Sequence, residues 1–554
     1  MKLVLLSKVI GGEMMRNEFA GTATLTFLAF KRDWLKLFIW LAVITTLVTS
    51  VGIAMKDLMP THEEVMKQIV VRAESPAIRL FDIPAAGISV ESAMLMRSSI
   101  LIGIFIVLVS MQTMIRHTRQ NEETGRTEMI SSTAVGKYSS LTAGLIVSVI
   151  FNIFIGSAIA AALIFNNFQM EGAVLTGFAF AALGITFAGI TSIAVQLSQT
   201  SSGAAGMVAV TFGVVFLISS IGDVLGEFNR DTFSVESHWL VWLSPWGWLG
   251  QVYAFHDNNW WIISLYSLLF LVTVLIAFYL IKKRDVGMGL FPAKKGPAFA
   301  SKMLLSPIGL MWRLQRRLIL SWVVAMFIFG MVIGAIGNEI QEMVSGLNNN
   351  QLLEMFGGNP NVVSSILASF LAFLATFVAV YFVLALLRLR HDEVDGYMEG
   401  VLATAVSRVR LLMVQVICVG LGLGVILFFL ALGAGITAKI STGDSMFLTL
   451  MEVTFYQAPA ILTLGGFTIL TIGILPRGAV AVSLAAVIFS LISGPMFGTM
   501  LGLPEIIQNI SPFAYTVIDQ SGNIDWSSLL RLMIIALTFA TVGIISFCRR
   551  NLTF

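Results

Sequence analysis

The chain has little charge for its length. Asp, Glu, Lys and Arg make up 12% of its 554 residues, hydrophobic residues make up 57%, and the mean hydropathy is +0.89. No globular surface hides that much apolar side chain from water, so the composition excludes a soluble protein and predicts an integral membrane protein. The net charge of +3 is too small to indicate a nucleic-acid partner.

Cysteine and histidine are scarce and unclustered. The two cysteines, Cys418 and Cys548, lie far apart in apolar runs, which predicts neither a disulfide framework nor a metal site. The five histidines are scattered through loops and span ends, and the sequence has no HExxH motif or recognisable Ser/His/Asp order. We therefore expect no catalytic residues, no metal and no enzyme activity in this chain.

The sequence also lacks a phosphate-binding loop. The nearest candidate, Gly136-Lys137, has Ser131 where the GxxxxGK[ST] motif requires its first glycine. The predicted spans contain almost no charged residues, so an ion-coupled mechanism would have few buried groups to use. These absences favour an energy source on a separate subunit.

Long apolar runs dominate the chain. A helix needs about 20 mostly apolar residues to cross a bilayer. The sequence predicts twelve such spans, at residues 35–55, 95–115, 141–165, 172–196, 203–222, 260–281, 318–337, 362–387, 411–436, 453–475, 478–500 and 527–547. Six spans fall in each half, which predicts an all-α polytopic membrane protein built from two parallel repeats.

A polar segment is repeated between the second and third spans of each half. RQNEETGRTEMISSTAVGK (residues 119–137, the first box) returns as RHDEVDGYMEGVLATAVSR (residues 390–408, the second box), with seven of nineteen positions identical. The halves are therefore internal duplicates in which the segment between the spans was kept.

Lys and Arg indicate the orientation. With the N-terminus in the cytoplasm, 26 of the 34 fall in cytoplasmic segments or their flanks, including nine at the central connection and eight in the two boxes. This asymmetry predicts that these segments and both termini are cytoplasmic. We expect a first half at residues 1–281, a linker at 282–311 and a second half at 312–554. The first half lacks a signal-peptide pattern and begins with a surface helix over residues 3–30, and the linker ends in a similar surface helix.

Each box has the features of a rigid docking element. Gly125 and Gly396 favour the positive φ that ends a helix, and a short helix can follow each of them. A loop without a partner should diverge after duplication, so we expect both boxes to bind a cytoplasmic protein. The residues assigned to this surface are Arg119, Glu122, Glu123, Gly125, Glu128, Arg390, Glu393, Gly396 and Glu399, with Glu122, Glu128, Glu393 and Glu399 as its polar anchors.

Two further pairs of related segments lie on the predicted outer side. The long loops at residues 56–94 and 338–361 contain the related pieces RLFDIP and EMFGGNP. Before the last span of each half, the Ser-Pro-aromatic sequences Ser244-Pro245-Trp246 and Ser511-Pro512-Phe513 predict short segments that dip into the outer interface.

Taken together, these motifs resemble a family. The E-x-x-G-x-x-E box followed by Thr-Ala-Val, at Glu122 to Lys137 and Glu393 to Arg408, is similar to the coupling-helix region of export-type ABC transporter permeases, specifically polyketide-antibiotic and tetronasin-type exporters. The surface helix before the first span resembles their connecting helix, and the Ser-Pro-aromatic segments resemble their outer re-entrant helices. The second box has Val394 where the first has Glu123, so the two boxes are not equivalent.

The resemblance implies two six-helix bundles like those of G-subfamily ABC exporters, in the plasma membrane of a bacterium. Two copies of a separately encoded ATPase, which bind ATP and Mg²⁺, would dock on loops 116–140 and 387–410 and drive an amphipathic drug-like or polyketide-like compound outward. This chain would bind no cofactor itself. A substrate cavity would include Phe105, Met111, Phe373 and Phe377.

Two other readings remain open. An ion-coupled twelve-span secondary carrier shares the parallel six-plus-six arrangement, but the loop between spans two and three lacks the G-x-x-x-D-R-x-G-R-R pattern of such carriers. A membrane sensor or assembly factor could dock a cytoplasmic partner through the same boxes, although it would not need two equivalent bundles.

Overall fold

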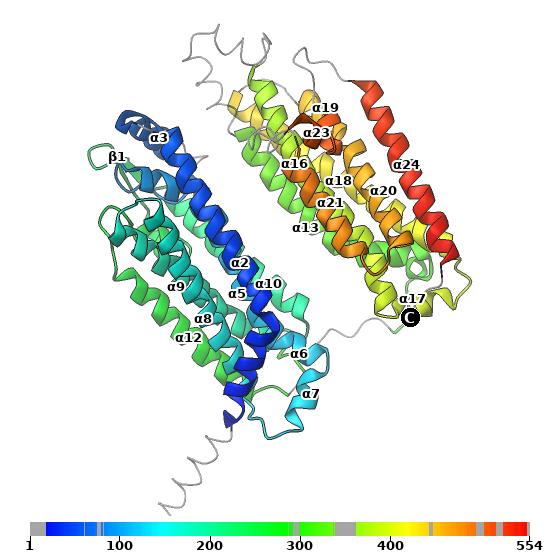
Figure 1. Ribbon diagram of the computed structural model, residues 1–554, viewed down its shortest axis with the longest axis horizontal. Helices are drawn as coiled ribbons and strands as arrows, with labels where there is room; N and C mark the ends of the chain where they lie inside the picture. The colour runs from blue at the N-terminus through cyan, green and yellow to red at the C-terminus, as the bar shows by residue number, and fades with distance from the viewer. Residues whose placement is uncertain are drawn as a thin grey trace, which may run out of the picture. The chain divides into compact units, whose positions relative to one another are not determined.

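The fold comes from a computed structural model of the whole chain (Figure 1). The structure describes residues 18–59, 61–74, 79–80, 82–285, 287–291, 298–335, 337, 362–442, 447–494, 504–516 and 525–550. The chain divides into two compact units, Met1–Lys295 and Gly296–Phe554. Helices dominate both units, as expected for an all-α polytopic membrane protein.

The first unit contains the following described elements: α2 (Thr22–Leu58), α3 (His62–Glu74), α5 (Val90–His117), α6 (Arg119–Glu123), α7 (Arg126–Ser131), α8 (Ser139–Phe165), α9 (Met170–Leu197), α10 (Ser201–Val224), β1 (Glu227–Asn229), β2 (Ser234–Glu236), η1 (Trp239–Leu243), α11 (Gly247–Gln251) and α12 (Ile262–Lys282). The two strands form an antiparallel hairpin. Helix α9 is the centre of this unit because it packs against α5, α8, α10 and α12.

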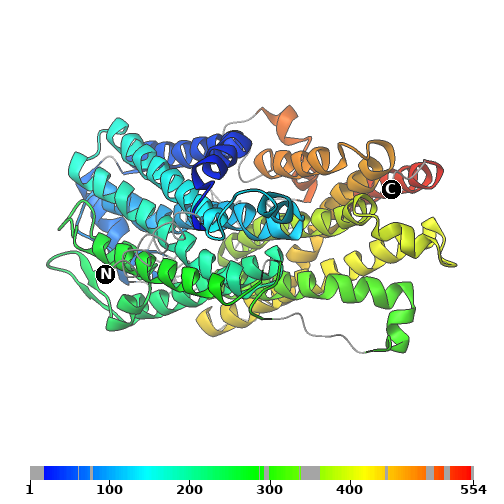
Figure 2. The same ribbon diagram turned by 90° about the horizontal axis from the view of Figure 1, so that it is seen from below.

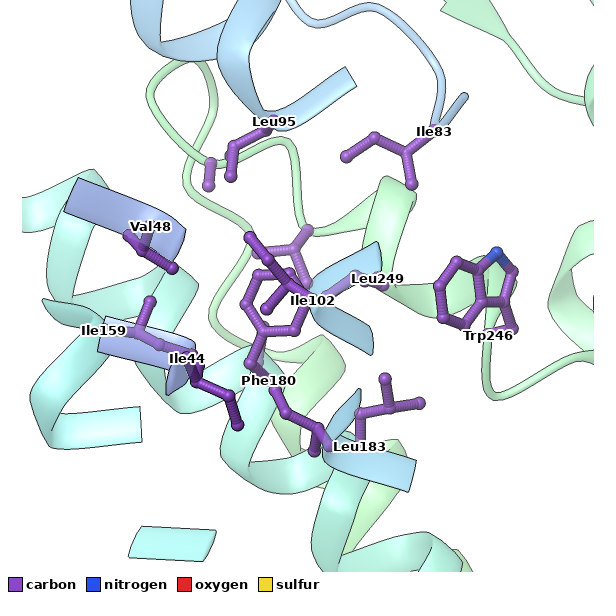
Figure 3. Close-up of a cluster of buried hydrophobic side chains, with 14 of the residues drawn as sticks. Ile44, Val48, Ile83, Leu95, Ile102, Ile159, Phe180, Leu183, Trp246 and Leu249 are labelled. Carbon is purple, nitrogen blue, oxygen red and sulfur yellow. The ribbon is translucent and has the colours of Figure 1, made fainter. Parts of the chain in front are cut away.

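The core of the first unit is a cluster of aliphatic and aromatic side chains between these helices (Figure 3). Phe180 and Leu183 of α9 lie beside Ile102 of α5, and Ile44 of α2 lies beside Ile159 of α8 (Figure 3). All five are buried. In a bilayer, such contacts rely on close van der Waals packing, since lipid tails are as apolar as the side chains.

The second unit repeats the sequence of long helices. Its described elements are η2 (Lys302–Leu305), α13 (Pro307–Ala335), α16 (Val362–Val394), α17 (Tyr397–Leu402), α18 (Arg408–Thr442), α19 (Phe447–Tyr456), α20 (Ala458–Ile474), α21 (Ala479–Ile492), α23 (Glu505–Gln508), η3 (Pro512–Thr516) and α24 (Trp526–Arg549). Here α16 is central and packs against α13, α18, α19, α20 and α21. Figure 2 shows the helices of each unit side by side from a second direction.

Contacts between helices follow the same pattern in both units. The pairs α2 with α8, α5 with α8, α5 with α9 and α9 with α12 correspond, span by span, to α13 with α18, α16 with α18, α16 with α20 and α20 with α24. These four helix pairs therefore have the same order along the chain in both units.

Eleven described helices are long and apolar enough to cross a membrane. The remaining expected span, the eleventh in chain order at residues 478–500, has as its described part only the shorter apolar helix α21. The span expected at 453–475 is divided into α19 and α20 at Gln457, two residues before Pro459.

The expected surface helices differ from the structure. Residues 22–30 belong to α2, which continues into the first span without a break. The second surface helix is likewise replaced by the short η2 turn and by α13, which runs from Pro307 into the seventh span. The piece EMFGGNP and residues 3–17 lie outside the described residues.

Candidate functional site

The first box forms two short helices joined by a tight turn at one end of the first unit. Helix α5 ends at His117, Thr118 departs from helical geometry, and α6 carries Arg119 to Glu123. Gly125 has φ 70°, in the left-handed region, and α7 follows it at once. The expected positive φ and the short helix with Glu128 are both confirmed.

Glu122 is held inside the unit by two arginines. Arg119 pairs with Glu122 from one turn earlier on the chain. Arg284, just after the end of α12, donates from Nη2 to Glu122 Oε1 at 2.6 Å and from Nη1 to Oε2 at 2.8 Å. This bidentate geometry is the strong form of an arginine–carboxylate pair. Glu122 therefore joins the box to the end of the last helix of its unit.

Two further contacts bind the first box to the turn between α9 and α10. Arg119 Nε donates to the carbonyl oxygen of Ser198 at 2.7 Å. Glu123 Oε1 accepts from the backbone N–H of Ser201, the first residue of α10, at 2.9 Å, and so places a carboxylate at a helix N-terminus. Arg284 Nε also donates to Gln196 Oε1 at 2.5 Å.

The Thr-Ala-Val end of the first box lies on the residues that precede α2. The N–H groups of Gly136 and Tyr138 each donate at 3.0 Å, to the carbonyl oxygens of Ala20 and Glu18 respectively. The ring of Tyr138 lies 5.3 Å from that of Phe19. The box thus contacts the start of the first span as well as the end of the last one.

The second box has the same turn but a different entry. Helix α16 continues through Glu393 to Val394, Gly396 has φ 77°, and α17 follows. Glu393 is fully buried. Arg390 Nη1 lies 2.9 Å from Glu393 Oε2, and Arg550, directly after α24, donates to the same oxygen.

The second arrangement is less complete than the first. Glu393 Oε1 is buried and has no hydrogen-bond partner among the described residues, whereas both oxygens of Glu122 are bonded. Val394, which replaces Glu123, is exposed and has no carboxylate to offer a helix N-terminus. The expected difference between the boxes thus has a structural counterpart in their hydrogen bonding.

The outward-facing side chains of each box lie on the short helix that follows its glycine, α7 or α17. In the first box Glu128 is exposed and Met129 is 75% exposed. In the second box Tyr397 is 69% exposed and Glu399 is exposed. Of the four proposed anchors, Glu128 and Glu399 therefore face outward, while Glu122 and Glu393 lie within their own unit.

The four residues proposed for a substrate cavity are half-buried. Phe105 lies 5.8 Å from the ring of Trp40 on α2, and Phe373 and Phe377 on α16 lie edge to face at 5.1 Å. Met111 packs against the core of the first unit. A shallow hollow of about 740 Å³ beside the start of α2, lined by residues such as Phe19, Phe27 and Phe30, includes none of the four.

The first Ser-Pro-aromatic segment is packed tightly between helices. Ser244 Oγ donates to the carbonyl oxygen of Val215 on α10 at 2.7 Å, and the Pro245 carbonyl accepts from Tyr266 Oη on α12 at 2.7 Å. Trp246 is buried, and its ring centroid lies 5.5 Å from that of Phe212.

The second Ser-Pro-aromatic segment repeats the serine contact. Ser511 Oγ donates to the carbonyl oxygen of Ser490 on α21 at 2.8 Å, and Pro512 and Phe513 are buried. Helix α21 follows α20 in the second unit as α10 follows α9 in the first. The serine of each segment therefore donates to the corresponding helix of its own unit. A serine whose hydroxyl bonds a span carbonyl explains why this residue type recurs.

Sequence reasoning missed the arginines opposite each box. Arg284 and Arg550 lie 162 and 157 residues after their glutamates, so alignment of the two halves at one offset does not pair them. It also missed Asp33 on α2, a buried carboxylate 2.9 Å from Arg116 Nη2 and 3.1 Å from His117 Nε2, and the buried Asp223 near the end of α10. In the sequence, Asp33 and Asp223 each stand at the edge of an expected span, at residues 35–55 and 203–222, and that position is the signal that could have found them.

Similarity to known proteins covers nearly the whole chain. Residues 304–548 match the family model described as "Multidrug efflux system permease Rv1217c, C-terminal domain". Over 540 residues, the chain is 29% identical to the multidrug efflux system permease protein Rv1217c of Mycobacterium tuberculosis, covering 97% of this chain and 96% of that protein. This multi-pass membrane protein is therefore similar, from its first helices to its last, to a multidrug efflux permease.

Proposed function

We propose that this chain is the membrane-spanning permease subunit of a drug efflux system. It moves hydrophobic or amphipathic compounds out of a bacterial cell, and two copies of a separate ABC-type ATPase supply the energy. The similarity to an efflux permease over 97% of the chain carries this proposal. The repeated helix contacts support its finer form, in which two six-helix bundles work as a pair.

The ATPase would bind the outward-facing helices of the two boxes. Each box presents one large apolar side chain, Met129 or Tyr397, next to an exposed glutamate, and the buried ion pairs hold that helix on the ends of the spans. A large exposed side chain on a preorganised support is typical of a residue that dominates a protein interface.

The test is co-expression with a candidate ABC-type ATPase from the same genome, followed by purification on a tag placed on this chain. The tagged wild-type chain should retain the ATPase, and the Met129→Asp, Tyr397→Asp double variant should lose most of it, because two charges would replace the apolar contacts. Trp239→Asp is the matched control. Trp239 is also exposed, but it lies on η1, beside the end of α10 that is remote from the box. Equal retention by the wild type and the double variant would refute the docking role.

A secondary carrier is the second candidate, because the structure contains buried carboxylates that the sequence did not indicate. Asp33 and Asp223 are both 4% exposed. A buried titratable group is the usual mark of ion coupling, although the pairing of Asp33 with Arg116 and His117 also suits a structural role. Vesicles that contain this chain alone and accumulate ethidium in response to a proton gradient would favour the carrier.

A further inference from the structure

We propose that Arg284 and Arg550 are positioning residues that transmit movement of each box to the last helix of its own unit. The inference rests on the proposed function and assigns the transmission step to residues outside the boxes. In both units a glutamate of the box binds an arginine within two residues of the end of the last long helix, α12 or α24. We call these contacts the first clamp (Glu122 with Arg284) and the second clamp (Glu393 with Arg550).

The clamps are built to keep two elements together. Both glutamates and both arginines have side chains no more than 12% exposed, so separating either pair would leave a charge in surroundings with little water. Such a separation is strongly unfavourable. A displacement of the box is therefore carried to the helix end rather than absorbed between them.

Each clamped helix reaches a second structural element at its other end. Near the start of α12, Tyr266 donates to the carbonyl oxygen of Pro245 in the first Ser-Pro-aromatic segment. In the second unit α24 packs against η3, which begins at Pro512 of the second segment. A contiguous path thus runs from box to clamp, along one rigid helix and into the segment expected at the outer side.

The clamps differ in how fully they are bonded. The first joins both oxygens of Glu122 to Arg284, and Arg284 is fixed further by Gln196. The second uses one oxygen of Glu393, and the other has no hydrogen-bond partner among the described residues. The first clamp should therefore transmit movement of its box to its helix more completely than the second clamp does. We expect its removal to reduce transport more.

The experiment compares Arg284→Gln and Arg550→Gln with Lys283→Gln and Arg549→Gln, which remove neighbouring exposed positive charges. The full chain is co-expressed with the candidate ABC-type ATPase and placed in vesicles. Three quantities are measured: ATPase retained on the tagged chain, ethidium transported per ATP hydrolysed, and melting temperature in detergent. The Arg284→Gln variant should retain the ATPase but transport about tenfold less per ATP, with a smaller loss in Arg550→Gln.

A triple variant separates positioning from folding. Because Arg119 also pairs with Glu122, replacing Arg119, Glu122 and Arg284 together by glutamine leaves no unpaired charge at the first clamp. This variant should melt close to the wild type, yet it should transport as little per ATP as Arg284→Gln alone. Arg284→Lys, which keeps the charge but not the bidentate fork, should restore part of the ratio.

The outcomes distinguish the two proposals. If the wild type retains the ATPase and transports, but both clamp variants match Lys283→Gln and Arg549→Gln in transport per ATP, the clamp inference is wrong and the proposed function stands. The same holds if the triple variant recovers transport together with melting temperature. A wild-type chain that retains no ATPase overturns both.

Discussion

Two glycines show how single residues shape the boxes. Gly125 and Gly396 have φ values of 70° and 77°. Apart from their chain neighbours, no described residue has an atom within 4 Å of the place a Cβ would occupy. Space is therefore not what requires glycine. The requirement comes from the left-handed backbone, which side chains disfavour.

The loss of stability on substitution at this turn should consequently depend on how well the new residue tolerates a left-handed backbone, and not on its size. Gly125→Ala should cost about 1 kcal/mol of stability, because alanine resists the left-handed conformation, while Gly125→Asn should cost less. Thermal melting of the purified chain checks this. Gly400→Ala is the control: it also lies in open space, but inside the short helix α17, where alanine is favoured. A similar loss in the alanine and asparagine variants of Gly125 would contradict the argument.

At the scale of elements, small residues let the spans approach each other. A Cβ on Gly177 of α9 would overlap the carbonyl oxygen of Gly156 on α8, and a Cβ on Gly156 would overlap that of Gly177. Backbones this close exclude any side chain between them. Glycine at such a crossing is typical of helix pairs in membranes, which pack by shape and not by the hydrophobic effect.

A larger residue at this crossing should force α8 and α9 apart. We expect Gly177→Val to destabilise the chain by about 2 kcal/mol through overpacking, and to lower the melting temperature in detergent. Gly206→Val on α10 introduces the same side chain at a place where, in the described part of the chain, no atom lies within 4 Å of the added Cβ, so it should have a small effect. Equal melting temperatures for the two variants would show that the α8–α9 contact is looser than described.

At the scale of the whole molecule, the two units share one plan. Each has its own buried core, its own box and its own clamp. The positive-inside distribution of Lys and Arg predicts that both boxes face the cytoplasm. Both unit ends that carry a box should therefore be reached from the same side of the membrane.

Cysteine labelling in cells tests that orientation. In a background without Cys418 and Cys548, cysteines at the exposed positions Met129 and Tyr397 should react only with a membrane-permeant maleimide, whereas one at Trp239 should also react with an impermeant reagent. Labelling of Met129→Cys and Tyr397→Cys from opposite sides would refute the parallel arrangement of the halves.

Much of this protein follows from the sequence because it depends on local chemistry. Long apolar runs must become helices in a bilayer, since only a helix satisfies its own backbone there. Eleven of the twelve expected spans accordingly appear as long apolar helices. The turn at Gly125 followed from the same kind of reasoning, because glycine is the residue that adopts a positive φ without strain.

What only the tertiary structure decided depends on residues far apart in the chain. The sequence presented Glu122 and Glu393 as charged residues in polar loops, and an outward role was the natural prediction. Folding brings Arg284 and Arg550 to them across 162 and 157 residues and buries the pairs. A charge run does not reveal whether its partner is water, another protein or its own chain, because that depends on which helix ends meet.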